Sequence, residues 1–401
     1  MFPLPFLLAA ACAPGNVDLQ EPSVSDETLA GEIPDSDWIF DDSLIHEIEI
    51  RLSPEAWADL EALPYEYTQA SVLIDGVSAG EVGVRLRGKV GSFRPISGKP
   101  KFKLDFNRIH PGRRFYGLEA LSLNNEVADC SYLKEPLGYE VIRQAGGPAS
   151  RTAFAHVQVN GADYGLYVLI ETQDDRFLAR NWDDGSGNLY DGKYLYDWTT
   201  GAYTLLDFTP ELQDHLQQEE GEDVGHADIH GITDAIAGSW NTGAFMSGTS
   251  EVIDWPAMHT HLVAEQWIQQ NDGYALNANN YRVYFNPEDG QAELISWDLD
   301  NSFMPDFWSY TWTNPRGLLV QGCWQDAACV ADWKAAAQEL HETLDTADLA
   351  ARYEAWDELT FRAAIEDPRR ECSEDQLRSE RLRLRAWIDE RPAQFSQAWG
   401  L

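Results

Sequence analysis

The feature that most constrains the fold of this chain is a short predicted β-hairpin with aspartates at both of its ends. Residues 281–285 (YRVYF) and 292–297 (AELISW) are strand-forming runs, and the sequence NPEDG between them is typical of a turn. Asp272 precedes the first run in a polar loop, and Asp298 and Asp300 follow the second. Such a hairpin can place one carboxylate near a nucleophile and others on a divalent cation.

The charge of the chain excludes some classes of partner. The 401 residues include 67 acidic and 29 basic side chains, which gives a formal net charge of −38. A negative field of this size argues against nucleic acid or an anionic membrane surface as a general partner. Taken alone, the acidity indicates a highly soluble or salt-tolerant surface.

The basic residues are concentrated in one stretch. Residues 85–114 contain ten Lys and Arg side chains and a single acid, Asp105. In so acidic a protein, this excess indicates either a site built for an anion, of which phosphate is the commonest, or a cationic surface strip.

The first residues predict export. Residues 1–11 are apolar but too short to span a bilayer, and small side chains precede Cys12, which is a candidate for lipid attachment. The sequence departs from a typical signal because no Lys or Arg occurs before Arg51. Residues 13–37 are acidic and contain Ser, Pro and Gly, as expected of a disordered tether. We therefore expect residues 1–37 to be a signal and tether, and the protein to reside in the cell envelope or outside the cell.

The other cysteines allow more than one arrangement. They are Cys130, Cys323, Cys329 and Cys372. Cys323 and Cys329 share a short loop and can form a disulfide in an exported protein, while the pairing of all four stays open. The spacing lacks the C-x-x-C pairs typical of zinc sites, and the sequence contains no H-E-x-x-H, so we do not expect a structural zinc ion.

The periodicity of apolar residues predicts an α+β fold with two lobes. Strands are predicted at residues 44–52, 70–73, 82–86, 101–106, 153–159 and 164–170, and a helix at 131–145. Further helices are predicted at residues 210–220, 233–237, 255–269, 332–342, 346–354 and 376–391. A strand-rich lobe over residues 38–171 and a helix-rich lobe over residues 172–401 therefore join near Glu171 and enclose a cleft.

The order of these elements is that of protein kinases. Kinases place a glycine loop, a strand lysine, a helix, a hairpin, a hinge, a catalytic Asp and a metal-binding Asp in this order along the chain. Here the glycine loop is RGKVGS, and Lys101 and Lys103 lie on one face of the following strand. The usual kinase strings G-x-G-x-x-G, H-R-D and D-F-G are absent.

The sequence resembles the CotH-type proteins, a family of secreted or spore-coat atypical kinases. The resemblance rests on the strings VRLRGKVGSF, KPKFKLDF, DCSYLKEPLGYEVI, VNGADYGLYVLIETQDDRFL, NDGYALNANNYRVYF and ISWDLDNSF. It extends from about Trp38 to Trp399. It implies a two-lobed, atypical protein-kinase-like fold.

The resemblance also implies roles for acidic and amide side chains. Asp272 corresponds to the catalytic aspartate that orients or deprotonates a hydroxyl group. Asn280, with Asn277 as the alternative, corresponds to a metal ligand. Asp298 corresponds to the residue that binds Mg²⁺ at the nucleotide phosphates, with Asp300 as a second ligand or a support. The loop between Asp272 and Asn280 is longer than is usual in the family.

The remaining implied residues surround the nucleotide. Lys103 or Lys101 reaches the phosphates, together with Arg87 and Ser92 of the glycine loop, and Glu171 lies at the hinge beside the base. Two of these assignments have a structural alternative: the lysines can be the solvated face of an edge strand, and Glu171 can be structural instead of functional.

These expectations define three candidate functions. The first is Mg²⁺- or Mn²⁺-dependent transfer of the ATP γ-phosphoryl group to Ser or Thr of a protein substrate. The second, of a different class, is a surface-anchored binding or adhesion protein that keeps the fold without turnover. The third is transfer of another phosphate-borne group such as AMP, which needs nearly the same residues.

Overall fold

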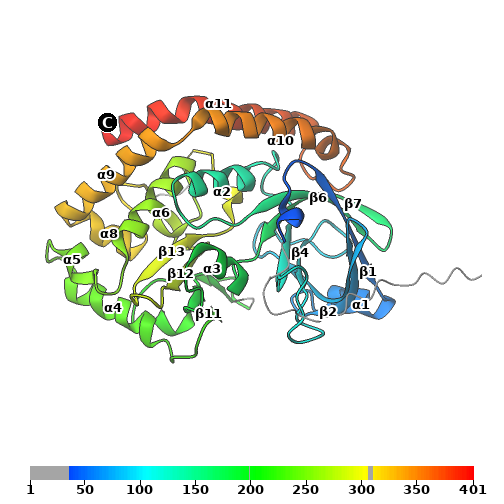
Figure 1. Ribbon diagram of the computed structural model, residues 1–401, viewed down its shortest axis with the longest axis horizontal. Coiled ribbons are helices and arrows are strands. Elements are labelled where there is room, and N and C mark those ends of the chain that lie inside the picture. Colours follow the sequence, from blue (N-terminus) through cyan, green and yellow to red (C-terminus); the bar gives the residue numbers. More distant parts are fainter. Residues whose placement is uncertain (1–35, 198, 306–309) are drawn as a thin grey trace, which may run out of the picture. The chain divides into compact units, whose positions relative to one another are not determined.

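The computed structural model describes residues 36–197, 199–305 and 310–401, and Asp35–Leu401 form one compact unit (Figure 1). The predicted export signal with Cys12, and nearly all of the predicted tether, lie outside the described residues. In the described part of the chain, no helix combines the length and the apolar character needed to cross a membrane.

Seven strands form a closed barrel in the first half of the chain. They are β1 (Ile45–Leu52), β2 (Thr68–Ile74), β3 (Val77–Arg87), β4 (Lys101–Asp105), β5 (Ala120–Asn124), β6 (Thr152–Val159) and β7 (Ala162–Glu171). Their order around the barrel is β1-β2-β3-β4-β5-β7-β6, with β1 and β6 parallel and the other neighbours antiparallel. Closure pairs the strands on both sides, which removes exposed edges.

Strand β4 has one apolar face and one basic face. Phe102 and Leu104 are fully buried in the barrel core, whereas Lys101 and Lys103 lie on the opposite face because successive side chains alternate along a strand. The register with β3 pairs Arg87 with Lys101 and Arg85 with Lys103. Two register pairs of basic residues therefore cover the outer face of β3 and β4.

The rest of the chain is mainly helical. Its longer helices are α2 (Lys134–Gln144), α4 (Ala227–Ser239), α6 (Trp255–Ile268), α9 (Ala327–Thr343), α10 (Thr346–Glu366) and α11 (Glu374–Trp399). Shorter helices are α1 (Pro54–Ala62), α3 (Asp175–Asn181), α5 (Phe245–Thr249), α7 (Tyr274–Asn277) and α8 (Leu318–Trp324). Local sequence fixes several starts; for example, the Ser53 side chain caps α1 by accepting from the Ala56 amide, and Pro54 occupies the first turn.

A four-stranded antiparallel sheet, ordered β11-β8-β12-β13, lies among the helices. The predicted hairpin is confirmed as β12 (Tyr281–Phe285) and β13 (Ala292–Ser296), and β8 (Leu189–Asp191) pairs with β12. The helix predicted over residues 210–220 is wrong. That segment contains a 3₁₀ turn, η2 (Gln213–His215), and then β11 (Gln217–Glu220), because pairing with β8 outweighs the local propensity.

Two of the three hydrophobic cores among the described residues underlie this arrangement. The smaller one fills the barrel, and the larger one joins α2, α6 and the C-terminal helices, with Trp267 and Trp333 fully or almost fully buried in it. Phe154, Val168 and Ile170 of β6 and β7 also belong to the larger core. The two cores therefore share the β6–β7 wall, and the division into lobes at residues 171 and 172 stays a prediction.

Two disulfides cross-link the described chain. Cys323 is bonded to Cys329, as the short loop allows, and Cys130 is bonded to Cys372. The second bond spans 242 positions of sequence and the first only 6. Since a cross-link restricts the unfolded chain more when its loop is longer, the two bonds contribute unequally to stability.

We predict that the Cys130→Ser/Cys372→Ser variant loses more stability than the Cys323→Ser/Cys329→Ser variant. Chain entropy gives about 5 kcal/mol for the long loop and about 2 kcal/mol for the short one. Guanidinium unfolding of the two variants beside the unmodified protein measures the difference. An equal loss in both variants would show that packing at the sulfur atoms, rather than loop closure, governs their contribution.

Candidate active site

Asp272 lies in the loop between α6 and α7, surrounded by amide side chains. Its carboxylate accepts hydrogen bonds from Asn277 Nδ2 at 2.6 Å, Asn280 Nδ2 at 3.0 Å and Asn279 Nδ2 at 3.2 Å. Burial raises the pKa of Asp272 to about 6, and the three amides act in the opposite direction. The carboxylate is thus held in one orientation, and its pKa is raised toward the neutral range.

The segment after β13 meets the Asp272 loop. Asp298 has a φ of +52° and Asn280 a φ of +49°, both in the left-handed region that non-glycine residues seldom occupy. Asn280 Nδ2 and Gln270 Nε2 lie 3.5 and 3.1 Å from the Asp298 carbonyl oxygen. The structure thereby brings the two ends of the hairpin together, and this arrangement requires two energetically costly backbone conformations.

Lys101 connects the barrel to these aspartates. Its Nζ lies 3.1 Å from Asp298 Oδ1 and 3.3 Å from Asp300 Oδ2, and the side chain is buried. Burial lowers the pKa of Lys101, but the surrounding carboxylates, with Asp298 and Asp300 first among them, together outweigh burial and raise it overall. The lysine is therefore a fixed cation between strand β4 and the segment that contains Asp298 and Asp300, which we call the acidic segment.

Arg87 holds a guanidinium group with unused hydrogen-bonding capacity over the same space. Its Nη1 is buried and has no hydrogen-bond partner among the described residues, and its guanidinium carbon lies 5.3 Å from the centre of the Trp297 ring. Burial lowers the pKa of Arg87. An unpaired buried donor is costly, and an anion such as a phosphate would satisfy it.

The glycine loop between β3 and β4 closes one side of this space. Gly88 has a φ of +97°, and a Cβ there would lie 3.0 Å from the Phe93 backbone, so the loop needs glycine at this position. Lys89 Nζ donates to the Tyr194 carbonyl oxygen at 2.7 Å and lies 4.3 Å from the centre of the Tyr194 ring. The loop is thus fastened across the opening by one lysine.

These groups line a polar cavity of about 430 Å³. Its lining comprises Tyr65, Arg85, Arg87, Gly88, Lys89, Val90, Gly91, Ser92, Lys101, Ala128, Asp191, Lys193, Tyr194, Asp272, Asn279, Asn280, Trp297, Asp298, Asp300 and Asn301. Basic side chains of β3, β4 and the glycine loop face carboxylates and amides of the segment that carries Asp272 and Asp298. The arrangement suits a polyanion on the basic side and a cation on the acidic side.

Three predicted site residues lie outside the lining of this cavity. Lys103 lies on β4 and pairs in register with Arg85 of β3, and burial lowers the pKa of Lys103. All three asparagines donate to Asp272, but Asn279 and Asn280 line the cavity and Asn277 does not.

Glu171 corrects the expectation of a carboxylate beside the nucleotide base. It is fully buried, and its oxygens accept from Arg151 Nη2 at 2.7 Å and Arg180 Nη2 at 2.5 Å. A carboxylate engaged by two arginines serves as an internal ion-pair partner, which is a structural role.

Sequence reasoning missed two buried acids near Lys101. Glu135, in the first turn of α2, accepts from Asn124 Nδ2 at 2.6 Å, and burial together with the charge of Asp298 raises its pKa. Both carboxylate oxygens of Glu126 are buried without a hydrogen-bond partner among the described residues, and burial raises its pKa well above the ordinary value. An acid in the helix after the lysine strand is a kinase feature, so the string SYLKEPLGYE contained the signal for Glu135.

The acidic segment fits a magnesium ion that also contacts phosphate. Asp298 and Asp300 offer two carboxylates, and Mg²⁺ commonly uses one or two carboxylates with water and phosphate oxygens as the remaining ligands. In the described part of the chain, three ligand atoms converge only at His259, Cys323 and Cys329, where the two sulfurs are joined in a disulfide. That group therefore offers a cation a single nitrogen in this state.

Comparison with known proteins gives the class of the chain. Its sequence matches the family described as CotH kinase protein over residues 84–395, and the chain belongs to this family. The predicted family and the predicted α+β, kinase-like fold are thereby confirmed.

Individual proteins show more distant likenesses. The chain is 24% identical to the inner spore coat protein H of Bacillus subtilis (strain 168) over 199 residues, which are 48% of this chain and 52% of that protein. The chain thus spans about half the length of this curated relative. Among solved structures it is similar to the Helicobacter pylori proinflammatory kinase CtkA (TM-score 0.34, 8% identity, 77% of this chain and 93% of that one). It is also similar to HipA in the Shewanella oneidensis MR-1 complex of HipA, HipB and operator DNA (TM-score 0.34, 10% identity, 78% and 68%).

The orphaned guanidinium predicts a loss of anion affinity on substitution. We expect Arg87→Met to weaken binding of inorganic triphosphate about 10- to 100-fold, because a charge-assisted hydrogen bond is worth about 1.5–3 kcal/mol. Isothermal titration calorimetry measures the affinity. Arg108→Met, at an exposed arginine that stacks on Tyr67, is the matched control and keeps the original affinity. Equal losses in both variants would indicate a general effect of charge instead of a site.

Proposed function

We propose that this kinase-family protein transfers the γ-phosphoryl group of ATP, with Mg²⁺ or Mn²⁺, to a Ser or Thr hydroxyl of a protein in the cell envelope or outside the cell. The observation that carries the proposal is that Asp272, Asn280 and Asp298 line the same cavity as Lys101 and Arg87. These residues come from the two ends of one hairpin and from two barrel strands, and together they face one cavity.

In this proposal the basic groups bind and orient the triphosphate. The orphaned Arg87 donates to a phosphate oxygen, and Ser92 in the glycine loop lies at the same wall of the cavity. Lys101, held by Asp298 and Asp300, is within reach of the same anion. Asp298 and Asp300 would hold the cation, which neutralises the charge of the phosphates when bound.

Asp272 acts on the acceptor. The hydroxyl oxygen forms a bond to the γ-phosphorus, the bond from that phosphorus to the β–γ bridging oxygen breaks, and ADP leaves. The hydroxyl proton passes to the Asp272 carboxylate, which is ionised at neutral pH because its pKa is about 6. The three asparagine amides hold the carboxylate in position, so that catalysis rests on orientation and charge neutralisation.

One observation favours a second candidate, a binding protein without turnover. Lys101 neutralises the two carboxylates that a cation needs, and its Nζ contacts both of them. A chain that kept this ion pair permanently would have no use for a metal. Transfer of AMP stays a third candidate, since it draws on the same groups.

Labelled ATP separates the three candidates. We expect label from [γ-³²P]ATP, and none from [α-³²P]ATP, on a protein acceptor incubated with the mature chain and Mg²⁺ or Mn²⁺. Asp272→Asn and Asp298→Asn should each reduce transfer by at least about 100-fold. The control is Asp289→Asn, in the exposed turn of the same hairpin, which should keep full transfer. Label from the α position would establish AMP transfer, and no nucleotide binding would support the binding protein.

The pH dependence reports on Asp272. Because the base must be ionised, we expect kcat to fall as pH drops through about 6, close to tenfold for each further unit. The low residual rate of Asp272→Asn should lack this inflection. A wild-type profile that is flat down to about pH 4, the ordinary range of a carboxyl group, would contradict the role of Asp272 as the proton acceptor.

A further inference from the structure

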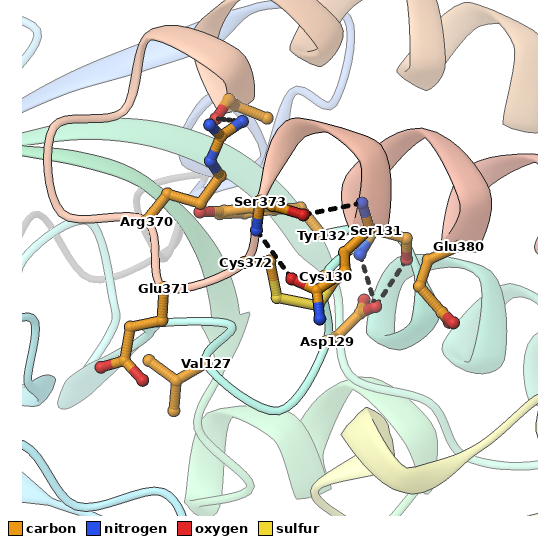
Figure 2. Close-up of a disulfide and its surroundings, with 12 residues drawn as sticks. Val127, Asp129, Cys130, Ser131, Tyr132, Arg370, Glu371, Cys372, Ser373 and Glu380 are labelled. Atoms are coloured by element: carbon orange, nitrogen blue, oxygen red, sulfur yellow. Dashed lines mark hydrogen bonds between the residues drawn. A yellow bond between two sulfur atoms is a disulfide. The ribbon is translucent and has the colours of Figure 1, made fainter.

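The loop between α10 and α11, residues 367–373, is bonded to parts of the chain more than 200 positions away. Cys372 forms the disulfide with Cys130, which lies four residues before α2 (Figure 2). Figure 2 shows Glu371 and Ser373 on one side of the bond and Asp129 and Ser131 on the other. The disulfide therefore joins the 367–373 loop covalently to the entry of α2.

Asp367 makes a second, buried connection. Its Oδ2 accepts from Lys99 Nζ at 2.5 Å, from the Tyr132 hydroxyl at 2.9 Å and from the Leu166 amide at 3.2 Å. The side chains of Lys99 and Asp367 are only 2% and 0% exposed. Gly165 permits this approach, because a Cβ there would lie 1.9 Å from Asp367 Oδ1.

Two arginines add polar contacts around the same loop. Arg369 donates to the carbonyl oxygens of Ser97, at 2.7 Å, and Asp163, at 3.0 Å. Arg94, just after the glycine loop, donates to Glu371 Oε2 at 2.5 Å. The loop is thus bonded to the segment that leads into β4, at Arg94 and Ser97, and to the start of β7, at Asp163.

The two anchored elements are those that supply the groups beside the acidic segment. Lys99 stands two residues before Lys101 on the way into β4, and Tyr132 stands three residues before Glu135. In the first turn of α2, Lys134 Nζ also donates to the Asp300 carbonyl oxygen at 3.0 Å. A single carboxylate oxygen of Asp367 therefore holds both the strand of Lys101 and the helix that contacts Asp300.

We propose that the 367–373 loop is a positioning element of the polar cavity. Through Asp367 and the Cys130–Cys372 disulfide, the loop fixes the positions of Lys101 and of the first turn of α2. As an account of nucleotide binding, this rests on the function proposed above. As an account of how β4 and α2 are held, it stands on the contacts alone.

The disulfide makes this positioning sensitive to reduction. Cys130 and Cys372 are half-buried, whereas Cys323 and Cys329 are fully buried. A dithiol reagent attacks the accessible bond through its thiolate and is itself oxidised to a disulfide, while Cys130 and Cys372 take up two electrons and two protons as thiols. Reduction under native conditions is thus expected at this bond and not at the other.

Hydrogen–deuterium exchange with nucleotide titration tests the proposal on the full chain. In Asp367→Asn, in Cys130→Ser/Cys372→Ser and in the dithiol-treated wild type, we expect exchange to accelerate at least tenfold in both residues 99–105 and residues 131–144. Exchange at the buried strands β12 and β13 reports the global loss of stability, and the two segments should accelerate at least tenfold beyond any change in these strands. Affinity for Mg²⁺ with a non-hydrolysable ATP analogue should fall at least tenfold in the same samples.

The matched control is Cys323→Ser/Cys329→Ser, which removes the other disulfide and should leave the affinity, and the exchange of both segments relative to β12 and β13, as in the wild type. Faster exchange confined to residues 367–373, with residues 99–105 and 131–144 unchanged, would overturn the proposal. The dithiol-treated wild type keeps the test decisive if a variant does not fold. If the wild type binds no nucleotide, the proposed function fails, and the exchange data still decide the positioning role.

Discussion

The contact on which the site depends is the ion pair of Lys101 with Asp298 and Asp300, at 3.1 and 3.3 Å. It joins a strand of the barrel to the segment that follows the second strand of the hairpin, 197 positions further along the chain. A buried pair of this kind gains less in stability than its geometry suggests, because both partners lose their hydration. Its value is positional, since it fixes β4 against the segment that contains Asp298 and Asp300. The left-handed backbone at Asp298 and Asn280 and the three amides around Asp272 complete the same convergence.

Much of this could be predicted from the sequence because the signals are local. Alternation along β4 placed Lys101 and Lys103 on one face, and the two apolar runs around the NPEDG turn predicted the hairpin with its flanking aspartates. The alternation could not decide between the two lysines, since both occupy the same face. Their difference depends on which one lies opposite Asp298, and that is a property of how the barrel meets the helical part.

The remaining features depend on contacts between distant parts of the chain. The family resemblance implies that Glu171 lies at the hinge beside the nucleotide base, yet Arg151 and Arg180 occupy its carboxylate. No sequence pattern pairs Cys130 with Cys372 across 242 positions, and none shows that Asp367 accepts from Lys99. The role of β11 was likewise hidden, because its helix-like composition is overridden by pairing with β8.

The central claim is that one cavity binds a cation and a triphosphate together, with Lys101 and Arg87 on the phosphate side. A crystal structure with Mg²⁺ and a non-hydrolysable ATP analogue tests it most directly. The account predicts phosphate oxygens within hydrogen-bonding distance of Arg87 Nη1 and Lys101 Nζ, and the cation on Asp298. It would be contradicted by a cavity that stays empty at saturating analogue, or by phosphates bound elsewhere while Lys101 keeps both aspartates.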